Sequence, residues 1–307
     1  MTLNDAAPPR DLVGYGAHPP HPKWPGNARL AVNFVINYEE GSEYSVEHGD
    51  GFDEGTLTDL GQSAVPHGEP DMAARSLFEY GSRVGFWRLW RLFNDRALPV
   101  TVFGCAQALE RNSEVASAIA ESNHDVCCHG WRWIEHSRLS EDEEREHIRL
   151  AIASFENTLG ARPLGWYCRS GPSVNTRRLL TEEGGFLYDS DAYNDELPYW
   201  IQVDHTPHLV VPYSLTNNDG QFTRGAVAHG EDFYRLIVDS FDMLRAEGEH
   251  QPKMMSIGTH CRLIGHPARA AGLARVLDYM QQFDDVWFTH RIDIAKHWRR
   301  LFPAEQS

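Results

Sequence analysis

The chain has 307 residues, and its content of 41% hydrophobic and 23% charged residues is typical of a globular protein rather than a disordered one. This length is common for a single α/β barrel, so we expect one domain over residues 1–307. The formal net charge of −16 argues against nucleic acid and membranes as partners, because an acidic surface repels phosphate groups.

Targeting and cysteine patterns favour a cytoplasmic protein. The sequence has no run of roughly 20 apolar residues that could cross a bilayer. Its first residues lack the charged and apolar regions of a signal peptide. The five cysteines are odd in number and form no CxxC pair. We therefore expect reduced cysteines in the core, with neither a disulfide framework nor a thiolate zinc site.

In chain order, residues 1–28 are rich in Pro and Gly, and we expect an ordered lead-in that packs across a barrel surface. The rest alternates between short apolar runs, which predict buried strands, and longer segments with helical spacing. Strands are expected at 29–38, 99–105, 124–130, 162–169, 186–193, 209–214, 253–261 and 286–290. Helices are expected at 73–94, 107–122, 140–159, 173–184, 230–248, 268–283 and 291–301.

The alternation of strand and helix predicts parallel strands joined by right-handed crossovers. Seven or eight such repeats favour a closed barrel over an open sheet. Ser140 and Glu143 have the spacing of a capping box at the head of one predicted helix. Two polar segments, 41–72 and 194–208, follow strands directly, so we expect both to cover the top of the barrel.

Polar and aromatic side chains gather at the C-terminal ends of five predicted strands, which is where α/β barrels place catalytic residues. They are Glu39 and Glu40, His129 and Trp133, Trp166 and Arg169, Asp189 and Asp191, and His260 and Arg262. Adjacent carboxylates at a strand mouth can supply an inward base or ligand and a supporting group. Structural interpretations stay open: the carboxylate pair as a solvated strand end, and His129 as a core residue. Arg169 could also bridge to Asp189 or Asp191.

Several motifs resemble those of the polysaccharide deacetylase family, and within it the branch of bacterial allantoinases of uric acid breakdown. They include NYEEG at 37–41, HGWRWI at 129–134 and GTHCRLIGHPAR at 258–269. The resemblance covers most of the chain. It implies a single distorted (β/α) barrel with seven or eight parallel strands, and for the branch a metal-independent enzyme and a homotetramer.

The resemblance also bears on metal binding. In the family, a first motif carries two acidic residues, a general base and a metal ligand, and a second motif carries two histidines that complete the metal site. Glu39 and Glu40 take the acidic positions. His129 matches the first histidine, whereas Trp133 occupies the place of the second. Two ligands are fewer than the three that a catalytic zinc requires. We therefore expect no cofactor, with zinc or another divalent metal as the alternative, held by Glu40, His129 and possibly His136.

For the branch, the resemblance implies hydrolysis of a C–N bond in a small cyclic amide, the ring opening of allantoin to allantoate. We expect Glu39 as general base, Glu40 as its helper, and His260 as the acid that protonates the leaving nitrogen. The residues expected to bind the substrate are His129, Trp133, Trp166, Arg169, Asp189, Asp191 and Arg262.

Among these, His129, Arg169 and Arg262 would hold carbonyl oxygens, and the two tryptophans would form the pocket walls. The two aspartates would orient Arg169 or bind ring N–H groups. Three alternatives stay open: a cyclic imide hydrolase of the same branch, a metal-dependent N-deacetylase of chitooligosaccharides, and an inactive barrel used for binding.

Overall fold

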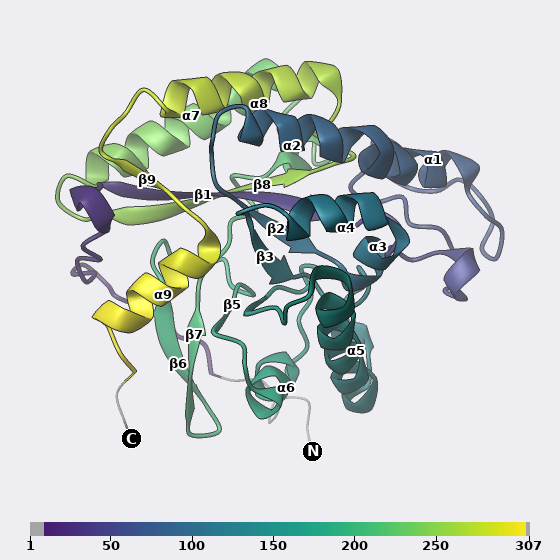
Figure 1. The fold of residues 1–307 in the computed structure, drawn as a ribbon, viewed down its shortest axis with the longest axis horizontal. Helices are drawn as coiled ribbons and strands as arrows, with labels where there is room; N and C mark the ends of the chain where they lie inside the picture. The colour runs from purple at the N-terminus through teal and green to yellow at the C-terminus, as the bar shows by residue number, and fades with distance from the viewer. Residues whose placement is uncertain (1–8, 305–307) are drawn as a thin grey trace.

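The computed structural model describes residues 9–304, whose strands curl into a half-barrel with helices around its outside (Figure 1). The strands are β1 (Leu30–Tyr38), β2 (Val100–Gly104), β3 (Asp125–Cys128), β4 (Gly165–Trp166), β5 (Tyr188–Asp189), β6 (Tyr199–Val203), β7 (Thr206–Val210), β8 (Lys253–His260) and β9 (Val286–Phe288). They lie in the order β6-β7-β5-β4-β3-β2-β1-β8, and β9 pairs with β1. The pairs within residues 9–304 are parallel except for β6 with β7.

The predicted distorted barrel of mostly parallel strands is confirmed, but its ladder does not form the complete ring expected from the alternation of strand and helix. The path ends at β6 on one side and at β8 on the other. The physical reason is that β6 occupies the edge of β7. Contact with β8 is made by the following segment instead: Asn218 forms an isolated parallel bridge with Gly258, whose amide donates to the Asn217 carbonyl at 2.9 Å.

The helices lie outside the sheet, with α7 and α8 packed side by side near β1 and β8 (Figure 1). The α-helices are α1 (Met72–Tyr80), α2 (Phe86–Asn94), α3 (Ala106–Arg111), α4 (Ser113–Ala120), α5 (Glu141–Leu159), α6 (Thr176–Glu183), α7 (Gly230–Glu247), α8 (Pro267–Met280) and α9 (Arg291–Leu301). Short helical turns are η1 (Pro25–Asn27), η2 (Val46–His48), η4 (His136–Arg138) and η5 (Asp219–Phe222). The capping box of Ser140 and Glu143 begins α5, as predicted. None of the helices within residues 9–304 is long and apolar enough to cross a membrane.

The helix predicted before β2 contains a π-helical turn, η3 (Gly81–Gly85), between α1 and α2. Glycine is required at both of its ends. A Cβ at Gly81 would collide with the Glu40 carboxylate, and one at Gly85 would collide with the carbonyl of Cys261. The turn therefore lets the helix lie directly against the C-terminal ends of β1 and β8.

The next predicted helix is also divided, into α3 and α4, at Asn112. The Asn112 side chain accepts a hydrogen bond from the Val115 amide and caps α4. It also donates to Ser82 in η3 at 2.9 Å. The break thus connects α4 to the π turn beside the strand ends.

Contrary to the prediction, the segment 194–208 does not cover the top of the barrel. Its β6 pairs with β7 as an antiparallel hairpin, because Tyr199–Val203 is rich in residues that favour strands and finds a free edge. Next to the hairpin, Glu196 pairs with Lys253 at the start of β8, at 2.9 Å. Trp200 donates to the Phe302 carbonyl at 2.8 Å. The hairpin therefore extends the sheet edge instead of covering the strand ends.

The described part of the lead-in packs across the barrel, as expected. The buried Trp24 donates from its indole to the Lys253 carbonyl at 2.9 Å, and Tyr15 donates to the Pro198 carbonyl at 2.7 Å. Residues 1–8 of this predicted lead-in lie outside the described residues. The five cysteines are buried, which confirms their predicted place in the core, and they are free.

The contact between α7 and α8 depends on two glycines. A Cβ at Gly272 in α8 would collide with the backbone of Gly230, the first residue of α7. We expect Gly272→Ala to lower the free energy of unfolding by about 1–3 kcal/mol, since one backbone must move away from the other. Urea denaturation measures the change. Ala271→Ser, at an exposed neighbouring position, is the control, and equal stability of the two variants would contradict the packing argument.

Candidate active site

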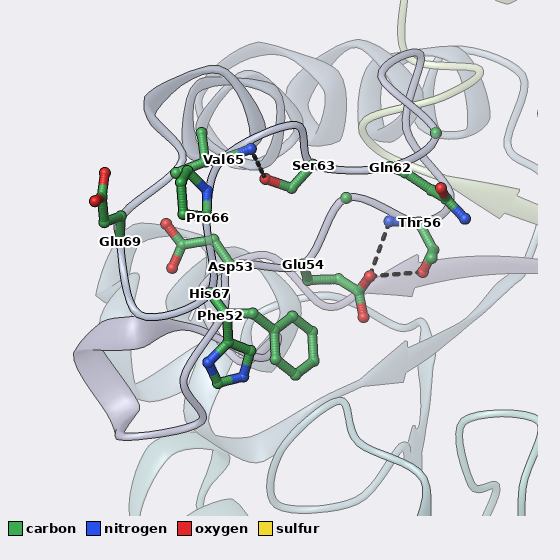
Figure 2. Close-up of a pocket in the computed structure, with 12 residues that line it drawn as sticks. Phe52, Asp53, Glu54, Thr56, Gln62, Ser63, Val65, Pro66, His67 and Glu69 are labelled. Carbon is green, nitrogen blue, oxygen red and sulfur yellow. Dashed lines mark hydrogen bonds between the residues drawn. The ribbon is translucent and has the colours of Figure 1, made fainter.

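One hollow lies within the insertion 41–72. It has a volume of about 290 Å³ and is lined by residues between Phe52 and Glu69 (Figure 2). Two of its carboxylates are already paired. Asp53 lies 2.6 Å from Arg75, and Glu54 lies 2.6 Å from Arg169. These carboxylates therefore hold the loop in place.

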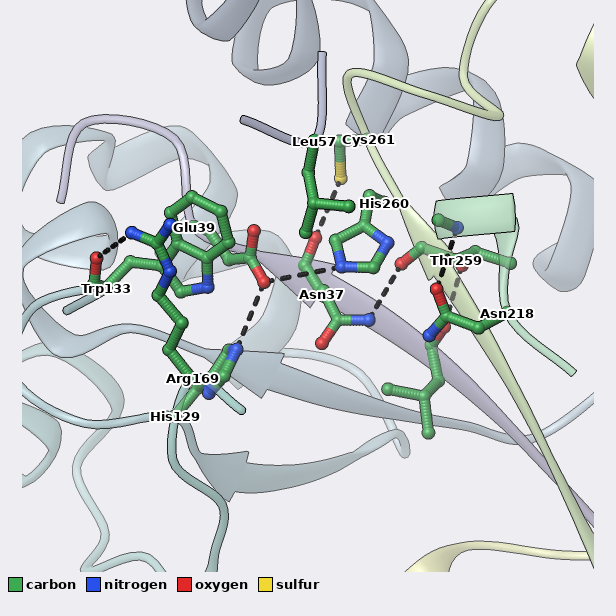
Figure 3. Close-up of polar contacts among 12 residues, drawn as sticks. Asn37, Glu39, Leu57, His129, Trp133, Arg169, Asn218, Thr259, His260 and Cys261 are labelled. Carbon is green, nitrogen blue, oxygen red and sulfur yellow. Dashed lines mark hydrogen bonds and ion pairs between the residues drawn. The ribbon is translucent and has the colours of Figure 1, made fainter. Parts of the chain in front are cut away.

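The second hollow lies at the C-terminal ends of β1, β3 and β8 and has a volume of about 230 Å³. Glu39, His129, Trp133, Arg169 and His260, predicted from distant parts of the sequence, meet there (Figure 3). Its full lining is Asn37, Glu39, Leu57, His129, Trp133, Glu135, Tyr167, Arg169, Ser170, Tyr213, Leu215, Asn218, Arg224 and His260. The insertion 41–72 contributes Leu57, so this insertion does cover the site as predicted.

The alternation of β1 explains why Glu39 and Glu40 face different ways. Successive side chains of a strand point to opposite faces. Val32, Phe34 and Ile36 join the core cluster beneath the helices, so Asn37 and Glu39 face the barrel interior. Glu40 points instead towards the π turn, where Gly81 leaves room for it. The adjacent carboxylates thus form an inward group and a buried supporting group.

Glu39 is the centre of the polar contacts. Its Oε1 lies 3.0 Å from His129 Nε2 and 3.6 Å from His260 Nε2, and dashed lines in Figure 3 mark both contacts. Its Oε2 lies 2.7 Å from Arg262 Nη1. Burial favours the neutral carboxyl, but Arg262 and then His260 and His129 outweigh it and hold the pKa of Glu39 well below its usual range. Glu39 is therefore a carboxylate at neutral pH.

His260 is held by Asp219, a residue that the sequence interpretation missed. Asp219 Oδ1 lies 2.5 Å from His260 Nδ1, and its Oδ2 accepts the backbone N–H of His260 at 2.7 Å. Burial alone would lower the pKa of His260, but the charges of Asp219 and Glu39 raise it above its ordinary value. Both ring nitrogens face carboxylates, which favours a hydrogen on each.

Arg262 was expected to hold substrate carbonyls, but it does not line the cavity. It is 1% exposed, and its Nη1 contacts Glu39 at 2.7 Å and Glu40 at 3.4 Å. Its Nε donates to the Leu57 carbonyl at 3.0 Å. Burial, only partly offset by Arg262, raises the pKa of Glu40. The guanidinium is therefore a buried counter-ion beside the two acidic side chains. Its contacts with Glu39 and Glu40 keep it out of the cavity lining.

Arg169 lines the cavity with its guanidinium 3.7 Å from the ring centroid of Trp133. The prediction that Asp189 or Asp191 orients Arg169 is wrong. The guanidinium charge is paired with Glu54 at 2.6 Å and Glu135 at 3.4 Å. The insertion supplies Glu54, which sequence spacing alone could not place next to Arg169.

Asp189, Asp191 and Trp166 are absent from the cavity lining, contrary to prediction. Asp189 is buried and contacts Arg177 at 2.9 Å and His208 at 2.8 Å. Asp191 accepts from a backbone amide at 2.8 Å, and burial raises its pKa to about 7. Trp166 is fully buried in the core. Trp166 and Asp189 lie in β4 and β5 and are fully buried, and Asp191 follows β5, so their contacts are made within the protein and not at the cavity.

The residues present do not fit the metal site of the resemblance. The guanidinium of Arg262 lies 4.6 Å from the Trp133 ring and already contacts Glu39 and Glu40, where it brings a positive charge. His136 does not replace the missing ligand, because its Nδ1 lies 3.1 Å from the buried Glu144. Within residues 9–304, no group of three or more His, Cys, Asp or Glu side chains is arranged to hold a metal ion.

The comparisons with known proteins agree with this fold. A family model described as polysaccharide deacetylase matches residues 69–187. A protein of Schizosaccharomyces pombe with a polysaccharide deacetylase name is 37% identical, over 96% of this chain and 98% of that protein. The chain belongs to the polysaccharide deacetylase family. The family predicted from the motifs is thereby confirmed.

Two crystal structures of this family superpose on the chain with a TM-score of 0.93. One is described as a polysaccharide deacetylase of Pseudomonas aeruginosa PAO1, 51% identical over 97% of this chain and 100% of that chain. The other, a PuuE allantoinase, is 49% identical over 97% and 99%. As a deacetylase-family member with these neighbours, the protein is a hydrolase.

Replacing Asp219 by Asn tests how His260 is held. We expect the pKa of His260 to fall by about one unit or more, because the substitution removes the facing negative charge that raises it. An NMR titration of histidine-labelled protein measures the pKa, with His260→Gln identifying the signal. Asp242→Asn removes an exposed carboxylate bonded to Tyr279 and is the control. An unchanged pKa of His260 in Asp219→Asn would contradict the assignment.

Proposed function

We propose that this protein opens a small cyclic amide by hydrolysis, and that its substrate is allantoin and its product allantoate. The observation that carries the proposal is the pairing of Glu39 with His260, 3.6 Å apart in a shared cavity. Their surroundings lower the pKa of the carboxyl and raise that of the imidazole. Before the reaction, Glu39 is therefore ionised and can accept a proton, and the protonated form of His260 is favoured and can donate one. The 49% identity to a PuuE allantoinase supports the choice of ring.

The proposed reaction uses the two groups in turn. Glu39 accepts a proton from water, whose oxygen bonds to the amide carbon, and the carbonyl electron pair moves to the oxygen. The oxygen then returns its electron pair to re-form the carbonyl as the C–N bond breaks, and the nitrogen, which keeps the bonding pair, takes a proton from His260. Glu39 can return its proton to His260 over their short separation. One water is thus added across the bond, and both groups regain their initial states.

The size of the cavity supports a small substrate. Its volume of about 230 Å³ is below the roughly 300–1,000 Å³ of pockets for drug-sized molecules. A ring with several N–H and C=O groups suits the polar lining better than a chain of sugars does. We also propose that no metal is needed, because Arg262 supplies the positive charge next to Glu39 and Glu40.

A substrate panel tests the proposal. Purified protein is assayed with allantoin, succinimide-type rings and N-acetylated chitooligosaccharides, before and after dialysis against a chelator, with metal analysis alongside. We expect ring opening of allantoin that survives chelation. Preference for succinimide-type rings would favour the cyclic imide alternative, and turnover of N-acetylated sugars alone would overturn the proposal. Ring opening abolished by chelator would overturn only the metal-free part.

Glu39→Gln tests the general base directly. The amide cannot accept a proton, so we expect kcat/KM to fall by about 10²–10⁴-fold. Glu47→Gln, at a side chain 63% exposed in the insertion, is the matched control and should keep its activity. Steady-state kinetics on the best substrate of the panel gives the comparison. Similar kcat/KM values for the two variants would remove Glu39 from the mechanism.

A further inference from the structure

The hydroxyl of Tyr213 has a hydrogen with no partner in the fold. Tyr213 follows β7, is 4% exposed, and lines the same cavity as Glu39 and His260. Its oxygen accepts from Asn218 Nδ2 at 3.2 Å and from Asn37 Nδ2 at 3.4 Å. Both hydrogen bonds use the tyrosine as acceptor.

The orientation of the two amides is determined independently. Asn218 Oδ1 accepts from the Gly220 amide at 2.8 Å, so its nitrogen must be the atom that faces Tyr213. Asn37 Nδ2 donates to the Thr259 carbonyl at 3.1 Å, which fixes its amide in the same sense. A hydroxyl has one hydrogen and two acceptor sites. With both acceptor sites in use, the remaining hydrogen is free to be donated.

The hydroxyl hydrogen of Tyr213 can be donated only towards the cavity. Within residues 9–304, no acceptor lies in hydrogen-bonding geometry to it, and the hydroxyl borders the cavity. Gly258 of β8 closes the opposite side, because a Cβ there would overlap the Tyr213 oxygen. Burial raises the pKa of Tyr213, so the hydroxyl keeps its hydrogen at neutral pH.

We propose that Tyr213 donates this hydrogen bond to the carbonyl oxygen of the substrate and stabilises the negative charge that forms there during attack. The inference rests on the proposed hydrolysis of an amide. When water oxygen bonds to the carbon, the carbonyl electron pair moves to the oxygen, and the Tyr213 O–H shares its hydrogen without transferring it. A fixed donor in a buried site stabilises such charge strongly, because no reorganisation is needed.

The arginines near the cavity are less suited than Tyr213 to stabilise the negative charge on the carbonyl oxygen. Arg169 is held by Glu54 and Glu135. Arg262 is absent from the cavity lining. Arg224 lines the cavity but is exposed, and water weakens its interaction with developing charge. Tyr213 therefore combines a place at the cavity, burial and an uncommitted hydrogen.

Tyr213→Phe tests the proposal, because it removes only the oxygen and keeps the ring. We expect kcat to fall by about 10²–10³-fold with a much smaller change in KM, since the bond strengthens as charge develops. The matched control is Tyr38→Phe, which removes a buried hydroxyl bonded to Ser82 at 2.8 Å, outside the cavity. Thermal unfolding of both variants verifies that they are folded.

The substrate panel separates this inference from the proposed function. An oxyanion donor acts on any amide carbonyl, so each variant is measured on whichever substrate the unaltered protein hydrolyses, ring or N-acetyl group. Turnover of N-acetylated sugars alone would overturn ring opening while a loss of kcat in Tyr213→Phe still supported the donor. A kcat within about threefold of the unaltered protein would overturn the role of Tyr213 whichever substrate is used. A reduction confined to KM would do the same.

Discussion

The buried ion pair between Arg262 and Glu39 is the contact on which the organisation of the site depends. Removing a guanidinium and a carboxylate from water costs several kcal/mol for each ion, so the arrangement is stable only where charges and hydrogen bonds compensate. Here Arg262 contacts Glu39 and Glu40 and lies 4.4 Å and 4.6 Å from the rings of Phe78 and Trp133. These contacts keep Glu39 ionised and leave its other oxygen facing His129 and His260.

The same contact explains how a deacetylase-family barrel can differ from the metal site that the family resemblance implies. The ring of Trp133 contacts two guanidinium groups, that of Arg169, which lines the cavity, and that of Arg262, which does not. His136 is buried and pairs with Glu144, outside the cavity lining. Positive charge is thus supplied by side chains that follow β8 and β4, and negative charge by side chains that follow β1 and by the insertion 41–72.

Much of this site could be predicted because short apolar runs in the sequence mark where the strands end. Glu39 follows a buried strand with the parity of Asn37, and His260 ends another strand, so both had to lie at one rim of a parallel barrel. Asp219 could not be found in this way, because it lies in the irregular segment that bridges to β8 through Asn218, and no periodic pattern marks such a segment. Tyr213 lies at the end of the strand expected at 209–214, but a tyrosine there fits the core pattern equally well, so the spacing gave no sign of a polar role.

The sequence by itself determined the family, the barrel of parallel strands, the buried cysteines and the identity of the central carboxylate and histidines, because these depend on local pattern and strand order. Tertiary structure decided the rest. It determined the ion pairs: Arg262 contacts Glu39 and Glu40, and Arg169 contacts Glu54. Asp189 contacts Arg177 and His208. The partner of a charged side chain depends on distance and burial between elements that are remote in sequence, and both are set only when the chain has folded.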